Sequence, residues 1–170
     1  MENLAFSYLN GKGASRNVKM AKQWMEKAAA SGSTLAITTL GIWHYEGELG
    51  QRDYVTARKY FLDSFERQNR LAAAYLGGIY LNGEGVAKNQ ILGMAYLRQG
   101  ALMNSPDAMY WLALEYESGV AEARNPAMAI KCASEAARLG MQPAGALVQK
   151  LSRSTSGQDI TSARKLERCV

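Results

Sequence analysis

The sequence predicts an all-α fold, a solenoid of about five helix-turn-helix units that repeat every 36 residues. Composition favours helices, because alanine is abundant, only three prolines occur and alternating runs of β-branched residues are scarce. The repeat itself is the stronger observation, since its phase never slips along the chain. Each unit therefore supplies one helical hairpin, and neighbouring hairpins stack on one another.

The first helix of each unit carries matching residues at fixed positions. The face turned toward the paired helix is marked by three columns, which are Leu4, Leu40, Leu76, Leu112 and Val148; Tyr8, His44, Tyr80 and Tyr116; and Ala36, Ala72, Ala108 and Ala144. A glycine ends each of these helices, as expected where the backbone of a C-cap is left-handed. The four glycines are Gly11, Gly47, Gly83 and Gly119.

The second helix of each unit keeps the same register. Its columns are Ala21, Ala57, Gly93 and Ala129; Trp24, Tyr60, Tyr96 and Cys132; and Ala29, Phe65, Ala101 and Ala137. A short polar residue at one phase predicts the N-cap of each second helix, because its side chain accepts a hydrogen bond from the first turn. These caps are Asn17, Asp53, Asn89, Asn125 and Thr161. The predicted caps of the first helices are Ser33, Asn69 and Ser105.

One segment shows the whole first-half pattern, Ala-x-x-x-Leu-Gly-x-x-Tyr-x-x-Gly-x-Gly-Val from Ala72 to Val86. The second-half pattern, Ala-x-x-Trp-x-x-x-Ala-Ala-x-x-Gly, is present from Ala21 to Gly32. Together these residues resemble the Sel-1-like repeat family, which is related to tetratricopeptide repeats. The resemblance implies antiparallel helix pairs stacked into a right-handed α-α superhelix. Two departures, Leu49 and Ala113, replace expected glycines and soften two joints.

We expect a single solenoid domain over residues 1–170, made of repeats 1–32, 33–68, 69–104 and 105–140, a partial repeat 141–156 and a closing helix within 157–170. No capping element precedes Leu4, so we expect either that the chain continues in a longer protein or that this end associates with a partner or a second copy. The fifth unit has Met141 at its capping phase.

Charge and cysteine content restrict the partners. The net charge is +5, but the 20 basic residues are dispersed among 15 acidic ones, so we expect a solvated outer face and no nucleic-acid partner. Cys132 and Cys169 show no metal-ligand spacing. A cysteine-rich subfamily of the resembled repeats pins each helix pair with a disulfide, and we expect neither cysteine to have a partner at suitable spacing.

Catalytic residues are not predicted. His44 is the only histidine, and its phase indicates a core-facing substitute for the tyrosines of its column. Neither a catalytic base beside a nucleophile nor a second metal ligand accompanies it. The acids Glu46, Glu48, Glu115 and Glu117 lie near helix ends, where solvated carboxylates are common. We therefore expect no enzyme activity, no metal and no cofactor.

A partner-binding groove follows from the phase of the first helices. Residues that point away from the paired helix would line an inner wall, and the alternative is that some of them pack against neighbouring repeats. The predicted residues are Phe6, Leu9, Asn10, Thr38, Ile42, Tyr45, Glu46, Ala74, Gly78, Leu81, Asn82, Tyr110, Leu114 and Glu117. Their apolar character favours aromatic anchors, and Glu2, Glu46 and Glu117 would supply an acidic rim.

The leading hypothesis is an adaptor or scaffold, in a bacterial setting suggested by the resemblance, that binds a protein segment with apolar anchors and basic residues. Two alternatives are a binder or hydrolase of cell-wall fragments, and an assembly element that associates through its ends. No apolar run is long enough to span a bilayer and the N-terminus lacks the pattern of a signal peptide. The compartment stays open between the cytoplasm and, if a leader has been removed, the periplasm.

Overall fold

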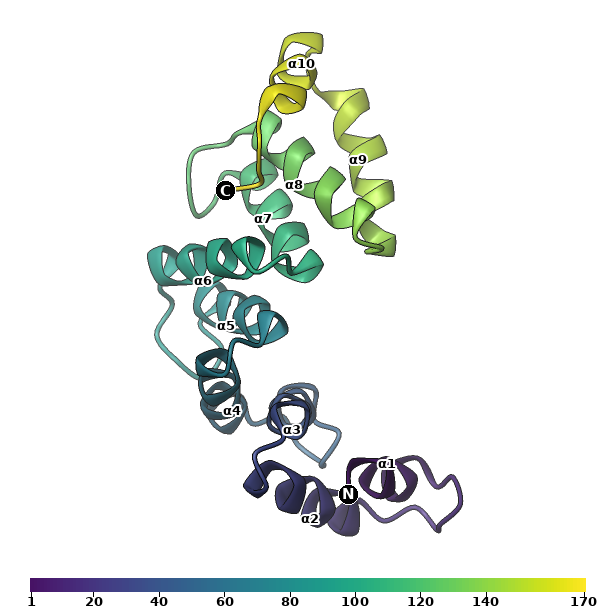
Figure 1. Ribbon diagram of the computed structural model, residues 1–170. Helices are drawn as coiled ribbons and strands as arrows, with labels where there is room; N and C mark the ends of the chain where they lie inside the picture. The colour runs from purple at the N-terminus through teal and green to yellow at the C-terminus, as the bar shows by residue number, and fades with distance from the viewer. The chain divides into compact units, whose positions relative to one another are not determined.

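The computed structural model describes all 170 residues as ten helices without a strand (Figure 1). Helices α2 to α9 each have 13 residues, whereas α1 and α10 have nine. Their bounds are α1 Glu2–Asn10, α2 Val18–Ala30, α3 Thr34–Glu46, α4 Tyr54–Glu66, α5 Arg70–Asn82, α6 Gln90–Leu102, α7 Pro106–Ser118, α8 Pro126–Arg138, α9 Gln142–Ser154 and α10 Gly157–Lys165. All ten are too short for any of them to traverse a lipid bilayer.

The chain divides into two compact units. Unit 1 comprises Met1–Ala72 with Glu84–Val86, and unit 2 comprises Ala73–Gly83 with Ala87–Val170. In unit 1, α1 packs on α2, α2 on α3 and α3 on α4. In unit 2, α6 packs on α7, α7 on α8 and α8 on α9, and α10 returns to lie on α8 (Figure 1).

The predicted N-caps are confirmed for seven helices. The side chain of each capping residue accepts a hydrogen bond from a backbone N–H two or three residues later. The confirmed caps are Asn17, Ser33, Asp53, Asn69, Asn89, Ser105 and Asn125. The prediction for Thr161 is wrong, because α10 begins earlier and Ser156 caps it by accepting from Asp159 N–H. Thr161 instead lies inside the helix and donates to Gly157 O.

One backbone hydrogen bond recurs in the loops that join the first helix to the second in the first four repeats. The N–H of the cap residue donates to the carbonyl of the aromatic column, from Asp53 to His44 at 2.8 Å and from Asn89 to Tyr80 at 2.8 Å. Asn17 and Asn125 make the same bond to Tyr8 and Tyr116; those two distances are 2.8 and 2.9 Å. A glycine with positive φ, such as Gly47 at 84°, reverses the chain in between. The loop therefore fixes where the second helix starts relative to the first.

Close packing inside the helix pairs depends on small residues facing large ones. A Cβ added to Gly41 would lie 2.7 Å from Phe61 Cε1, and one added to Gly77 would lie 2.4 Å from Leu97 Cδ2. Phe61 and Leu97 are one repeat apart and fully buried, so neither ring nor branch has free space to move into. The glycine column therefore sets how closely the two helices approach.

The first and fourth pairs carry alanine in place of glycine, and only the fourth has a small residue at the opposite phase. At the glycine phase they have Ala5 and Ala113, and at the phase of the large residue they have Met25 and Ala133. All four side chains are buried. The loss of glycine at position 113 is thus matched by a smaller residue at position 133, which explains why this departure from the repeat does not open the joint.

We predict that Gly77→Ala lowers the free energy of unfolding by about 1–3 kcal/mol, because the new methyl group overpacks Leu97. Urea unfolding followed by circular dichroism measures the loss. Gly78→Ala is the matched control, since a Cβ there meets no atom within 4 Å and alanine is the better helix former. Equal destabilisation by both substitutions would contradict the packing explanation.

Candidate functional site

The predicted groove residues of unit 1 fall into three groups. Leu9 and Thr38 are buried, and Thr38 Oγ1 lies 2.6 Å from Ser64 Oγ on α4. Phe6, Ile42 and Tyr45 are half-buried, whereas Asn10 and Glu46 are exposed. The buried pair contributes packing between helices, so the surface available to a partner narrows to the remaining five residues.

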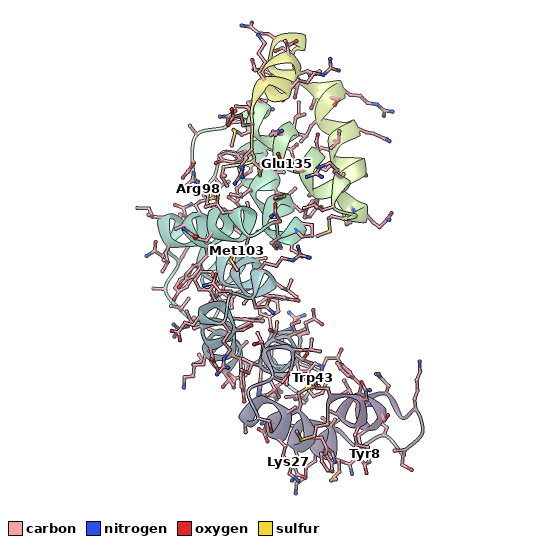
Figure 2. The ribbon with its side chains drawn as sticks, viewed as in Figure 1. Tyr8, Lys27, Trp43, Arg98, Met103 and Glu135 are labelled. Carbon is pink, nitrogen blue, oxygen red and sulfur yellow. A yellow bond between two sulfur atoms is a disulfide. The ribbon has the colours of Figure 1, made fainter.

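The two aromatic residues of this surface are held by their neighbours. Phe6 on α1 meets Trp43 on α3 edge to face, with 5.8 Å between ring centroids; Trp43 is labelled in Figure 2. Tyr45 packs edge to face on Tyr54, and its hydroxyl donates to Glu84 Oε2 at 2.8 Å. Rings fixed in this way lose little conformational entropy when a partner covers them.

The predicted residues of unit 2 are more deeply packed. Ala74, Gly78 and Leu81 are buried. Leu81 lies against α6, where a Cβ on Gly93 would be 2.7 Å from Leu81 Cγ. Asn82 is exposed. The face that α5 offers to a partner is therefore small.

Helix α7 supplies the larger surface in unit 2. Tyr110 and Leu114 are half-buried and pack against the core, and Glu117 forms a 2.9 Å ion pair with Lys150 on α9. Beside Tyr110 lies Trp111, whose side chain is 39% exposed. Sequence reasoning missed Trp111 because its phase holds Thr39 and Tyr75 in the preceding repeats. A tryptophan at a phase outside the buried columns is the signal that would have found it.

His44 occupies the core-facing position predicted for it. Its ring is 8% exposed and stacks on Tyr60 with 5.7 Å between centroids. The same stack recurs one repeat later between Tyr80 and Tyr96, at 5.6 Å. Burial, followed by the charge of Lys22, lowers the pKa of His44, and its Nε2 has no hydrogen-bond partner. The Nε2 edge of the imidazole is therefore buried as well.

The carboxylates at the end of α7 are not simply solvated acids. Burial raises the pKa of Glu115, with the charge of Lys88 acting in the opposite direction. Its neighbour Glu117 is held by Lys150. No group of three or more histidine, cysteine, aspartate or glutamate side chains lies in a metal-binding arrangement.

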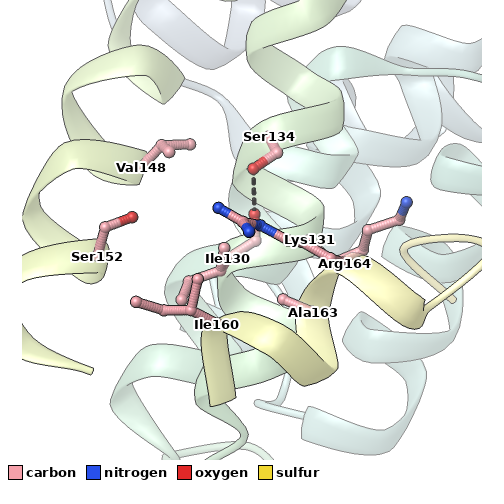
Figure 3. Close-up of a pocket in the computed structure, with 8 residues that line it drawn as sticks. All are labelled: Ile130, Lys131, Ser134, Val148, Ser152, Ile160, Ala163 and Arg164. Carbon is pink, nitrogen blue, oxygen red and sulfur yellow. Dashed lines mark hydrogen bonds between the residues drawn. The ribbon is translucent and has the colours of Figure 1, made fainter. Parts of the chain in front are cut away.

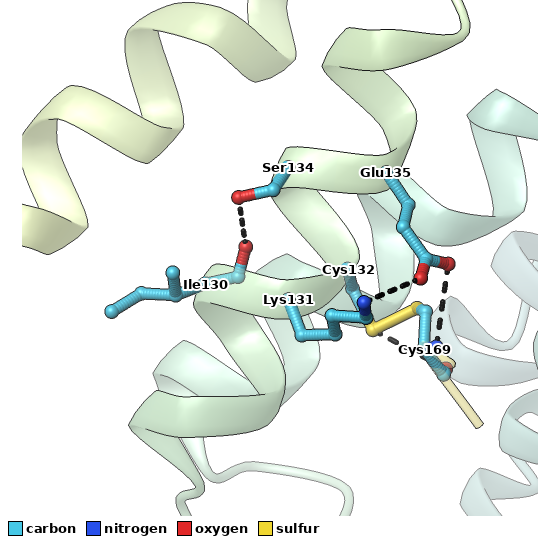
Figure 4. Close-up of polar contacts among 6 residues, drawn as sticks. All are labelled: Ile130, Lys131, Cys132, Ser134, Glu135 and Cys169. Atoms are coloured by element: carbon cyan, nitrogen blue, oxygen red, sulfur yellow. Dashed lines mark hydrogen bonds and ion pairs between the residues drawn. A yellow bond between two sulfur atoms is a disulfide. The ribbon is translucent and has the colours of Figure 1, made fainter. Parts of the chain in front are cut away.

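The expectation that the cysteines have no partner is wrong, because Cys132 and Cys169 form a disulfide (Figure 4). Cys132 lies on α8 at the phase of Trp24, Tyr60 and Tyr96, so the disulfide occupies the place of the second stacked ring. Cys169 lies in the tail beyond α10, and its N–H donates to Glu135 Oε2 at 3.3 Å. Glu135 in turn pairs with Lys131 at 3.1 Å. No repeat column marks position 169, which is why the pairing was missed.

A shallow hollow of about 270 Å³ lies between α8, α9 and α10 of unit 2 (Figure 3). Ile130, Val148 and Ile160 contribute apolar walls, and Lys131 and Arg164 add charge. Lys131 is already paired with Glu135. The hollow marks the place where the closing helix and α9 leave the surface of α8 partly uncovered.

A family model describes the chain as a Sel1 repeat protein. It matches residues 1–33, 35–63, 70–105 and 106–141. The chain belongs to the Sel1 repeat family, whose members generally serve as scaffolds for protein interactions.

Solved structures agree with this assignment. The fold is similar to that of a protective antigen of uropathogenic Escherichia coli with an SLR fold, with a TM-score of 0.81 and 30% identity over 95% of this chain and 35% of that one. A Sel1 repeat protein of Oxalobacter formigenes matches with a TM-score of 0.78 and 22% identity, over 96% and 69% of the two chains. Cysteine-rich protein B of Helicobacter pylori matches with a TM-score of 0.60 and 22% identity, over 81% of this chain and 98% of that one. The predicted all-α solenoid of the right-handed α-α superhelix class is confirmed.

We predict that reducing the disulfide destabilises the end of unit 2 by about 2–4 kcal/mol, because the tail is released from α8. Hydrogen exchange of the full chain, with and without a phosphine reductant, measures the loss of protection in α8 and α10. The Cys132→Ala/Cys169→Ala variant should show the same loss without reductant. Helices α1 to α3, which contain no cysteine, serve as the internal control, and unchanged protection in α8 would contradict the prediction.

Proposed function

We propose that this protein is a non-enzymatic scaffold that binds a segment of another protein on the exposed faces of its first helices. The family assignment supports a role in protein interactions. The observation that carries the proposal is that α7 leaves two consecutive aromatic residues accessible, half-buried Tyr110 and Trp111, which is 39% exposed. Tyrosine and tryptophan that are anchored in the core and partly exposed dominate the energy of protein interfaces.

The chemistry of this surface favours a partner with apolar and basic side chains. In unit 1, Phe6, Ile42 and Tyr45 supply apolar area beside the exposed carboxylate of Glu46. In unit 2, the exposed face of Trp111 can accept a lysine or arginine over its ring. The contribution of Glu2 and Glu117 to an acidic rim is smaller than expected, since Glu2 accepts from Ser33 and Glu117 pairs with Lys150.

An oxidising compartment, such as a periplasm, is the location we infer from the disulfide, because such bonds persist where thiols are not kept reduced. A hydrolase remains the less favoured function. The lone histidine is buried against Tyr60 and has no nucleophile beside it.

We predict that Trp111→Ala weakens binding of a selected peptide at least tenfold, because the variant removes an exposed anchor. Peptides selected from a random display library against the full chain provide the probe, and fluorescence anisotropy gives the dissociation constant. Glu46→Lys should lower the affinity for peptides that carry basic residues and leave the affinity for neutral peptides unchanged.

The control is Ile91→Ala on α6, which alters a side chain that is 86% exposed and lies on a second helix. It should leave affinity unchanged. If Ile91→Ala weakens peptide binding as much as Trp111→Ala does, the proposal that the first helices form the binding face is wrong. If no peptide binds while the chain self-associates in sedimentation, association through the ends replaces the proposal.

A further inference from the structure

A hollow of about 710 Å³ lies in unit 1, and its lining includes none of the residues proposed to bind a protein segment. It is formed by the start of α2, the end of α3 and the loop that leads into α4. Val18 and Leu49 give it apolar walls. Its volume is in the range of pockets that hold small molecules.

The charge of this hollow is strongly positive. Lys19 and Lys22, one turn apart on α2, and Arg52 of the loop provide three cations, whereas Asp53 is the one carboxylate of the lining. Lys19 forms no ion pair, and Lys22 meets Glu26 only at 3.7 Å with both side chains well exposed. Arg52 donates to the neutral hydroxyl of Tyr54 at 3.3 Å.

The single carboxylate is already engaged. Asp53 caps α4 by accepting from Thr56 N–H at 2.9 Å, and hydrogen bonds from Thr56 lower the pKa of Asp53. Because its oxygens serve the helix start, Asp53 neutralises the surrounding cations only in part. The hollow therefore keeps unbalanced positive charge against apolar walls, where a bound anion would be less screened than at a flat surface.

His44 supports a ligand site independently of the charge of the lining. It lines the hollow, is 8% exposed, and has a buried Nε2 without a hydrogen-bond partner. The charged and titratable groups that face it are Lys22 and Glu26 from α2, Asp53 from the loop before α4, and Tyr60 from α4. Burial and then the charge of Lys22 hold the pKa of His44 below its ordinary value, although Asp53 and Glu26 act in the opposite direction.

We propose that this hollow binds a small ligand through an oxyanion group, a phosphate or a carboxylate, held by Lys19, Lys22 and Arg52 beside His44. Arginine and lysine together supply both directed and freely rotating N–H donors for such a group. Val18 and Leu49 then contact the less polar part of the ligand.

This combination occurs at one joint of the repeat. The phase of Arg52 is basic throughout, with Arg16, Lys88 and Arg124 at the equivalent positions. The phases of Lys19 and Lys22 are not, since the next repeats have Val55 with Arg58, Ile91 with Met94, and Ala127 with Ile130. The column of His44 is otherwise tyrosine. Two lysines and a histidine thus coincide only where the first and second helix pairs meet.

The lone histidine allows a direct test by NMR, because its imidazole C–H signals need no assignment. The pKa of His44 is measured in the full chain without added oxyanion, then with inorganic phosphate and, separately, with succinate, at ionic strength matched by sodium chloride. A bound oxyanion stabilises the imidazolium, so the pKa should rise by on the order of one unit and saturate with concentration. A rise with phosphate alone or succinate alone identifies the source of the oxyanion.

The variants separate specific binding from general screening. Lys19→Gln/Lys22→Gln should raise the pKa of ligand-free His44, since it removes the repulsion from Lys22, and should abolish the response to either oxyanion. Lys59→Gln on the exposed side of α4 is the matched control and should respond as the unmodified chain does. A His44 signal that ignores both probes, or a response that survives in the double variant, would overturn the proposal.

Discussion

The close approach of the two helices in each pair is the constraint on which the rest of this structure depends. One position of the first helix holds Ala5, Gly41, Gly77 and Ala113 in successive repeats. The facing position of the second helix holds Met25, Phe61, Leu97 and Ala133. All four positions of the second helix are buried, and two of them lie where a Cβ on the facing glycine would collide. In the second and third pairs the glycine therefore leaves the space that the large residue opposite it needs, and the recurring hydrogen bond from the cap residue holds the loop that keeps the two helices in register.

Most of the architecture could be predicted because the same capping and core residues recur in each repeat. The cap at Asn89 and the stacked position of His44 each have equivalents 36 residues away, so a periodic sequence signal exists for them. Features that occur once had no such signal. The repeat pattern ends after Val148, so the start of α10 was predicted at the wrong residue. The pairing of Cys132 with Cys169 depends on the path of the chain after α10, which no repeat pattern describes.

The exposed face of the first helices was only partly predictable for a different reason. The helical phase predicted that Thr38 and Leu81 point away from the paired helix, but both contact it. Thr38 meets Ser64 on α4 and Leu81 lies against Gly93 on α6, so both are buried. Trp111 shows the opposite case, a large side chain left exposed beside Tyr110. Both proposed sites thus lie where the packing of the repeat leaves aromatic or charged groups uncovered, on α7 for a protein segment and beside His44 for an oxyanion.

The most direct test of this account is a double-mutant cycle between positions 77 and 97. Gly77→Ala overpacks and Leu97→Ala leaves a cavity, yet together they restore the alanine pair that positions 113 and 133 carry. The effects on the free energy of unfolding should be strongly non-additive. The loss in the double variant should be smaller than the sum of the two single losses by more than about 1 kcal/mol. Additive losses would contradict the claim that matched residue size sets the spacing of the helices.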